Sequence, residues 1–111
     1  MSMDFIIGIK MAIYIKIKKF LEKDDIGYYK AFVKECNEAD FYVGINKKEQ
    51  TISYYLTDDF SNSIYVVDCK NPYAFIGIIP GISHSDLGKV FMQAIKVFKL
   101  DEFPEYISHA S

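Results

Sequence analysis

Hydrophobic and polar residues alternate near the start of the chain. Over residues 11–19, isoleucine occupies every second position, at Ile13, Ile15 and Ile17, and Tyr or Lys fills most positions between them. A period of two places successive side chains on opposite faces of a β-strand. We therefore expect a half-buried first strand over residues 11–19.

The pattern then changes to a helical one. Asp24 or Asp25 can cap a helix, because a short acidic side chain accepts hydrogen bonds from the free N–H groups of a first turn. The apolar residues that follow recur at spacings of three and four, which makes one stripe along a helix. These residues are Ile26, Tyr29, Phe32, Val33 and Cys36. We expect a first helix in this segment.

Four aromatic-rich segments follow, and each has the composition of a β-strand. They are DFYVGIN, QTISYYLT, SIYVVDC and YAFIGII, which lie between residues 40 and 79. Short polar turns separate them, with KKE between the first two and KNP between the last two. Strands joined by short turns pair antiparallel, so we expect a meander.

A strong helical pattern follows the last of these strands. Pro80 and Gly81 end the strand, and Ser83-x-x-Asp86 has the form of a capping box. From about residue 86 to residue 99 the apolar residues repeat with a period near that of a helix. They are Leu87, Val90, Phe91, Ala94, Val97 and Phe98. We expect a second helix here, and a tail in which Pro104 stops any helix.

These elements add up to an α+β fold in the order β-α-β-β-β-β-α. We expect a single antiparallel sheet of four to five strands, with two helices packed on one face. A chain of 111 residues, 50% of them hydrophobic, is enough for one core. We take residues 1–111 as a single domain, with the core at about 11–107 and residues 1–10 as an extension.

The charge of the chain argues against nucleic acid as a partner. The formal net charge is −2, and all 13 basic residues are lysines. Domains that bind nucleic acid usually carry a basic excess, and arginine is the side chain that grips phosphate or guanine bidentately. We expect no nucleic-acid partner.

The apolar N-terminus favours neither export nor a membrane. Asp4 and Lys10 interrupt the apolar run, no basic segment precedes it, and no small-residue cleavage site follows. There is also no uninterrupted apolar stretch of about 18 residues to span a bilayer. We therefore expect a cytoplasmic protein with no membrane partner.

The segment PGISHSDLGKV, residues 80–90, is dense in reactive side chains. As a phosphate loop it lacks the glycine required at position 83 and the hydroxyl required at position 90. As a Ser/His/Asp site it has its three groups adjacent in sequence, where they rarely meet triad geometry. We interpret Ser83 and Asp86 as helix-capping residues. His84 and His109 leave a second interpretation open, in which they cleave RNA by acid–base transfer.

The remaining residues predict no metal or cofactor site. Cys36 and Cys69 form no CxxC pair, and two histidines are too few to complete a zinc set. The two cysteines fit free, buried thiols in a reducing compartment. The acidic residues fall at caps, turns and the tail, where charge is solvated. We expect no catalytic residue, no metal ligand and no cofactor.

The segment TISYYLTDDF supplies the strongest candidate site. By the period of two, Tyr54 and Tyr55 lie on opposite faces of the sheet, and Tyr55 can meet Tyr42 or Tyr65 there. One interpretation is a binding surface. The other, which the pattern leaves equally open, is that these rings only cover the second face of the sheet.

An acidic turn follows Tyr55. Asp58, Asp59 and Phe60 combine negative charge with an aromatic ring. A tyrosine beside carboxylates suits a protein-binding surface, because it joins an aromatic anchor to charge steering. We predict that Tyr55, Asp58, Asp59 and Phe60 contact a protein partner.

In size, acidic balance, four-strand α+β pattern and surplus of Tyr and Asp around residues 54–60, the chain resembles the small bacterial immunity proteins. These proteins neutralise cognate toxins, including those of contact-dependent growth inhibition. The resemblance implies stoichiometric occlusion of a basic, nuclease-type toxin domain. Asp58 and Asp59 would pair with its substrate cleft, and Tyr55 and Phe60 would anchor the contact.

Two alternatives stay open beside this function. The first is a small homodimeric ligand-binding or enzymatic α+β domain that pairs its sheet with a copy of itself. The second is a toxin-like ribonuclease that uses His84 and His109.

Overall fold

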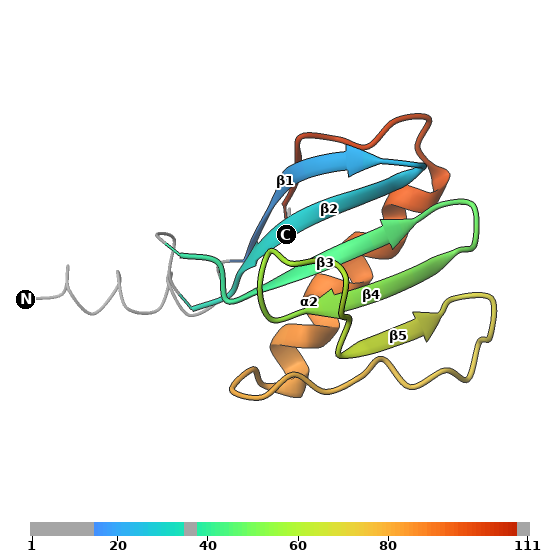
Figure 1. The fold of residues 1–111 in the computed structure, drawn as a ribbon. Helices are drawn as coiled ribbons and strands as arrows, with labels where there is room; N and C mark the ends of the chain where they lie inside the picture. The colour runs from blue at the N-terminus through green and yellow to red at the C-terminus, as the bar shows by residue number, and fades with distance from the viewer. Residues whose placement is uncertain (1–14, 35–37, 109–111) are drawn as a thin grey trace, which may run out of the picture.

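The computed structural model describes residues 15–34 and 38–108, which form one antiparallel sheet and one helical segment (Figure 1). Helix α2 (His84–Ile95) runs on into the 3-10 helix η1 (Lys96–Lys99). The six strands lie in the order β5-β4-β3-β2-β1-β6, and every neighbouring pair is antiparallel. They are β1 (Lys16–Lys23), β2 (Ile26–Phe32), β3 (Phe41–Asn46), β4 (Thr51–Tyr55), β5 (Tyr65–Asp68) and β6 (Tyr106–Ser108). We expected four to five strands and two helices. Both expectations are wrong, because the described residues form six strands and one helical segment.

The first expected helix is wrong because its segment is strand β2. Asp24 and Asp25 have positive φ angles, 53° and 66°, and form the turn between β1 and β2 instead of a helix cap. Asp tolerates this left-handed conformation, and two such residues in succession suit a tight hairpin. The segment also fits a period of two, since Gly27, Tyr29 and Ala31 are buried and the residues between them are less so. Pairing with β1 and β3 decides between the two periods.

The fourth expected strand, segment 73–79, is an extended loop. It lies beside β5, because the Phe75 ring contacts the Tyr65 ring edge-on, with centroids 6.1 Å apart. Gly77 has a φ angle of 102°, which is outside strand geometry. The segment therefore has the composition of a strand but not its hydrogen bonds.

Strand β6 was not expected. It extends the sheet beyond β1, with Ile107 opposite Ile17. A strand of three residues carries no periodic signal, so only its partner reveals it. The first strand is also shifted along the chain, because β1 begins at Lys16 and ends at Lys23. Residues 11–14 of the expected strand lie outside the described residues, as do Cys36, His109 and the expected extension.

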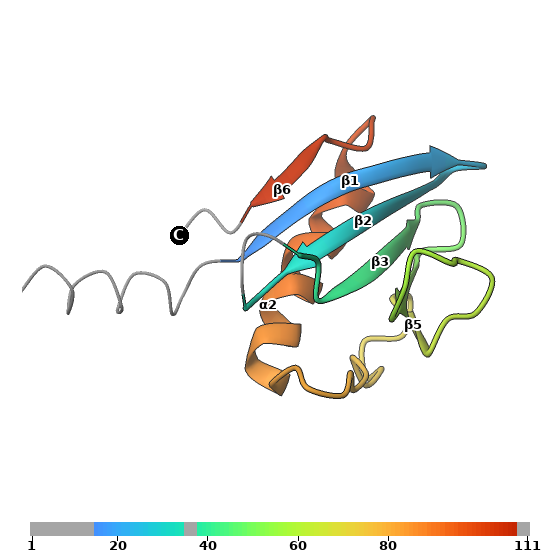
Figure 2. The ribbon, with the colours of Figure 1, turned by 60° about the vertical axis from the view of Figure 1, so that its left-hand side comes forward.

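The protein has two layers, the sheet and the helical segment that crosses one of its faces (Figures 1 and 2). We call the face toward α2 the inner face and the opposite face the outer face. The helical segment buries Leu87, Val90, Ala94 and Val97 against the inner face. The sheet residues buried there include Ile17, Tyr29, Ala31, Phe41, Val43, Ile45, Ile52, Tyr54 and Val67.

The start of α2 confirms Ser83 as the N-cap residue expected from the capping-box pattern. The Ser83 Oγ accepts a hydrogen bond from the Asp86 backbone N–H at 3.0 Å, and Asp86 lies in the positive first turn of the helix. His84 is exposed, and its ring stacks on Phe75 with centroids 5.8 Å apart. The segment 80–90 thus begins a helix, as its pattern predicts.

Candidate protein-binding face

The outer face presents a row of side chains across the central strands. The register places Lys30 of β2 opposite Tyr42 of β3, and Tyr42 opposite Tyr55 of β4. The side chains of one face alternate with those of the other along each strand, so these three lie together away from α2. In the described part of the chain, the loop of residues 56–64 covers a portion of this face.

Phe60 of this loop organises an aromatic cluster on the outer face. Its ring stacks on Tyr28, with centroids 4.2 Å apart and planes at 29°. It also meets the rings of Tyr55 at 5.1 Å, Phe20 at 5.8 Å and Tyr42 at 5.9 Å, all edge-on. Offset and edge-on ring pairs contribute about 0.5–1.5 kcal/mol each beyond the area they bury. We call these five residues the aromatic cluster.

The structure brings together part of the tyrosine set as expected. Tyr55 meets Phe60 and lies beside Tyr42, whereas Tyr65 pairs with Tyr54 on the inner side of the sheet. Tyr55 is only 8% exposed, because Tyr28 and Phe60 pack around it. Within the cluster Tyr55 is therefore a support, and the accessible apolar surface lies at Phe20, which is 39% exposed.

The loop carries a compact negative charge. Asp58 and Asp59 are exposed, and neither lies within ion-pair distance of a lysine in the described residues. The Asp59 carboxylate accepts hydrogen bonds from the Ser61 backbone N–H at 3.1 Å and the Ser61 hydroxyl at 2.7 Å. These bonds hold the pKa of Asp59 below its usual value, so the hydrogen bonds favour the charged form of this carboxylate. Hereafter residues 56–64 are called the acidic loop.

A group of lysines lies on the same face over β1 and β2. Lys16 and Lys18 alternate on β1, and Lys18 stands directly opposite Lys30. No carboxylate of the described chain lies within ion-pair distance of these three lysines. We call Lys16, Lys18 and Lys30 the lysine stripe.

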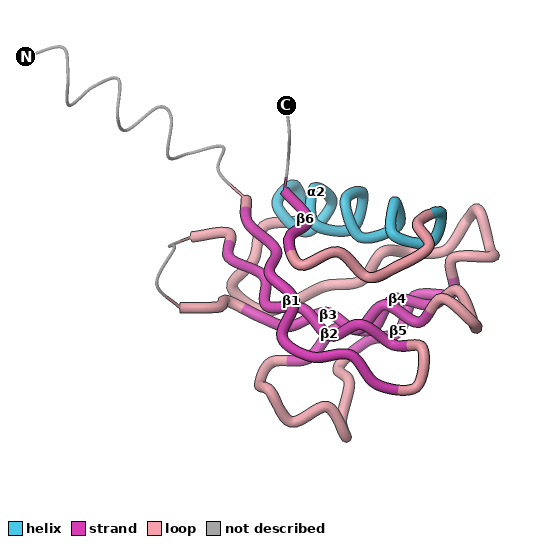
Figure 3. Tube along the Cα trace, turned by 90° about the horizontal axis from the view of Figure 1, so that it is seen from above, coloured by secondary structure: helices cyan, strands magenta, loops and turns pink. Residues whose placement is uncertain are grey.

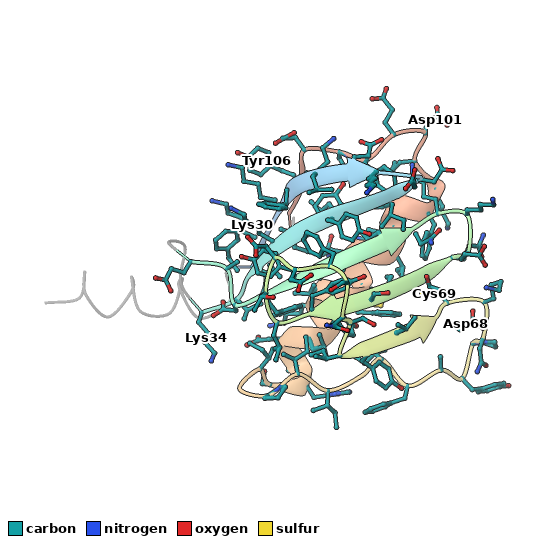
Figure 4. All side chains as sticks on the ribbon, in the orientation of Figure 1. Lys30, Lys34, Asp68, Cys69, Asp101 and Tyr106 are labelled. Atoms are coloured by element: carbon teal, nitrogen blue, oxygen red, sulfur yellow. The ribbon has the colours of Figure 1, made fainter. Side chains whose placement is uncertain are left out.

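Aromatic rings take the place of counter-ions along the lysine stripe. The Nζ atoms lie over the rings of Phe32, Tyr106 and Phe20, at 5.1, 5.8 and 5.0 Å from the centroids. Such contacts contribute about 0.5–1 kcal/mol at exposed sites. Tyr106 is 55% exposed, and Figure 4 shows Lys30 and Tyr106 toward the same end of the sheet. The sequence pattern missed this stripe, because Lys30 was assigned to a helix.

A second feature is a pocket between the inner face and the helical segment. It is open to solvent on one side, has a volume of about 530 Å³, and lies where loop 69–76 approaches the end of α2. Its wall is mainly apolar and includes Val67, Ile76, Phe91 and Phe98, with Lys99 and Gln50 among its polar residues. Cys69 also lines it, and burial raises the pKa of this thiol to about 11. A thiol with this pKa is protonated at neutral pH and is a poor nucleophile.

Other functional groups are not gathered in the described residues. Within residues 15–34 and 38–108, no three His, Cys, Asp or Glu side chains lie close enough together to hold a metal ion. No helix of this part is long and apolar enough to cross a membrane. His109 lies outside it, so the proposed pairing with His84 stays a prediction.

Comparison with known proteins adds no relative: no family model, no curated protein and no solved structure matches this chain. The geometry of the outer face and of the pocket is therefore the basis for the function proposed below.

Proposed function

We propose that this chain is a non-catalytic protein-binding module whose outer face contacts a protein partner. The observation that carries the proposal is the set of unpaired charges around a partly exposed aromatic cluster. Charged side chains without counter-ions can be matched by the complementary charges of a partner, which speeds association and selects the correct partner. The aromatic rings supply the apolar contact that such an interface needs at its centre.

The negative charge of the acidic loop favours a partner with a basic surface. Asp58 and Asp59 stand at the surface of an ordered loop, so their charges are presented without a large loss of entropy on binding. In the form implied by the resemblance to immunity proteins, the partner is a nuclease-type toxin domain, and the complex forms in the cytoplasm. The acidic loop then enters the basic substrate cleft and excludes the nucleic acid.

The proposal is tested by measuring whether the chain inhibits a nuclease toxin. The chain is titrated into a purified basic nuclease domain encoded beside its gene, and nuclease activity is measured together with complex mass. We expect complete inhibition at a one-to-one ratio, and an affinity about 100-fold lower for Asp58→Lys/Asp59→Lys, because two like charges then face the cleft. Asp101→Lys/Glu102→Lys, exposed in the η1–β6 connection, is the matched control. Equal inhibition by both variants would remove the acidic loop from the proposal.

The pocket favours a second candidate, a ligand-binding domain. A cavity of about 530 Å³ has the volume of a small-molecule site, and its wall combines apolar side chains with a few polar ones. The chemistry of the wall suits an apolar molecule that carries one anionic group near Lys99. Calorimetric titration with decanoate tests it. Ala74→Trp, which fills the pocket, should abolish binding, and unchanged binding by this variant would place the ligand elsewhere.

A further inference from the structure

The outer face is stepped. Over β3 and β4 it is raised by the acidic loop, which passes in front of these strands in Figure 1, while α2 passes behind them; the Phe60 ring of the loop reaches as far as Tyr28 of β2. Seen from above, the loop projects from the sheet on the side opposite α2 (Figure 3). Beside the loop, around Lys16 and Lys18 of β1 and Lys30 of β2, the face is low and carries the lysine stripe. Height and charge therefore change together across one surface.

The two halves of this surface are complementary to each other. The raised half ends in the carboxylates of Asp58 and Asp59, and the low half carries Lys16, Lys18 and Lys30. A two-fold axis parallel to the plane of the sheet, running along the boundary between the halves, would place each raised half on the low half of a second copy. An isologous interface requires this kind of self-complementary patch.

We propose that two copies of this chain associate through their outer faces, with the acidic loop of each copy seated on the lysine stripe of the other. The shared surface links this inference to the proposed function, because self-association and partner binding then exclude one another. The dimer is a resting form, and a partner must displace the second copy.

Repulsion between lysines in the monomer favours binding of a second copy at the lysine stripe. Lys18 and Lys30 stand directly opposite each other, and like charges in this relation destabilise an antiparallel pair. A carboxylate from a second copy removes this repulsion. By symmetry the same contact forms twice, so two loops and two stripes are neutralised in one step.

Apolar surface adds to the charge contacts. Phe20 and Tyr106 are 39% and 55% exposed on the low half, next to the lysine stripe. Leu56, on the acidic loop, is 49% exposed. Phe20 and Tyr106 lie where the second loop would be seated, and Leu56 lies on the loop that would be seated there. Burial of these side chains supplies a non-electrostatic part of the association energy.

The experiment reverses each half of the surface separately. The acidic variant is Lys16→Glu/Lys18→Glu/Lys30→Glu, and the basic variant is Asp58→Lys/Asp59→Lys. Sedimentation velocity over a range of concentrations should show a dimer for the wild-type chain, and association weakened about tenfold or more for each variant alone. The wild-type dimer should also dissociate as salt is raised.

Two rescues make the test specific. An equimolar mixture of the acidic and basic variants should form a heterodimer, and a chain that carries all five changes should dimerise with itself again. Both rescues exclude misfolding as the cause of the loss. Lys89→Glu/Lys96→Glu/Lys99→Glu, on the helical segment, makes the same change in charge as the acidic variant and should dimerise like the wild type.

The outcomes separate this inference from the proposed function. A wild-type chain that stays monomeric at all accessible concentrations overturns the dimer, and so does a mixture of variants that forms no heterodimer. Neither result changes the toxin titration. Conversely, a salt-sensitive dimer with both rescues would stand even if no nuclease were inhibited.

Discussion

Phe60 stacks on Tyr28, with ring centroids 4.2 Å apart, and this contact ties the acidic loop to strand β2. The loop connects β4 and β5, so the ring reaches past β3 to meet its partner. The position of the two carboxylates on the outer face depends on this contact. The loop is thus placed by one aromatic side chain, together with the Asp59–Ser61 hydrogen bonds within it.

Replacing Phe60 by alanine should destabilise the fold and release the loop. The substitution removes ring contacts with four aromatic side chains of the outer face. Because Phe60 is only half-buried, we expect a loss of about 1.5–3 kcal/mol in the free energy of unfolding, less than for a core phenylalanine. Urea denaturation measures it. Phe75→Ala, at a ring that is 51% exposed, is the control and should cost less. Equal losses would contradict the role given to Phe60.

The hairpin turn between β1 and β2 gives a second prediction. Asp25→Gly should stabilise the protein by about 0.5–1 kcal/mol, because glycine accepts the φ angle of 66° without strain. Asp25→Val should destabilise it by about 1–2 kcal/mol, since a β-branched residue resists this conformation. Thermal unfolding of the two variants is the measurement. At a helix N-cap, by contrast, Asp25→Gly would lower the stability by a few tenths of a kcal/mol, so a loss of stability for this variant would contradict the turn.

Removing the hydroxyl group should change the stability of the protein differently at two buried tyrosines. The Tyr29 hydroxyl donates a hydrogen bond to the Pro104 carbonyl at 2.7 Å, whereas the buried Tyr54 hydroxyl has no partner among the described residues. Tyr29→Phe should therefore cost about 1 kcal/mol, and Tyr54→Phe should leave stability unchanged or raise it by up to about 1 kcal/mol. Guanidinium denaturation compares the pair. A large loss for Tyr54→Phe would mean that its hydroxyl is satisfied by a group outside the described part.

Two glycines provide a matched pair for backbone strain. Gly77 has a φ angle of 102°, and an added Cβ would lie 2.8 Å from the Tyr65 ring. Gly77→Ala should therefore destabilise the protein by about 2–4 kcal/mol. Gly88 lies in α2, where the nearest atom to an added Cβ is 3.9 Å away, so Gly88→Ala should stabilise by about 0.5–1 kcal/mol. Thermal denaturation measures both variants. The prediction is contradicted if their changes in stability have the same sign.

Cys69 should react slowly with alkylating reagents. Burial, helped by the neighbouring Asp68 charge, raises the pKa of its thiol from 9.0 to about 11, so little thiolate is present at pH 8. In a Cys36→Ser background, the rate of iodoacetamide labelling should be far below that of the urea-unfolded chain and should rise as the pH approaches 11. Equal rates for folded and unfolded chains at pH 8 would contradict burial of the thiol.

The same shift has a consequence for stability. The folded state favours the protonated thiol, so its contribution is complete below pH 9 and is lost as the pH rises through about 11. Replacement of Cys69 by serine should flatten the stability profile in this window relative to the wild type. The comparison must be with the wild type, because the pKa values of Tyr29 and Tyr54 are also raised by burial and add to the alkaline loss.

Local patterns predicted the elements whose signals lie within the element itself. The α2 stripe and the Ser83 cap are of this kind, because a helix begins and buries one face through residues near each other in sequence. The antiparallel strands β3, β4 and β5 were expected for the same reason. Strand β2 was not, because residues 26–33 satisfy both a period of two and spacings of three and four. Its two neighbouring strands select the first.

The candidate site shows the same division. Tyr55 and Phe60 lie close in sequence and were assigned to the same predicted surface, and their rings are in contact. The contact of Phe60 with Tyr28 was not, since it depends on β2 being a strand. The lysine stripe was also hidden, because it needs the register that sets Lys30 opposite Lys18. Cross-strand relations of this kind are set by pairing and cannot be read along one segment.

The pairing of β6 with β1 has a kinetic consequence. Strands β1 to β5 are joined by sequential connections, whereas Ile17 meets Ile107 only when nearly the whole described chain has been brought around. Such a non-local contact gains energy late in folding, after the entropy of closing the long loop has been lost. Hydrogen exchange should therefore show β6 opening on its own, with the backbone amides of β3 protected until the whole protein unfolds.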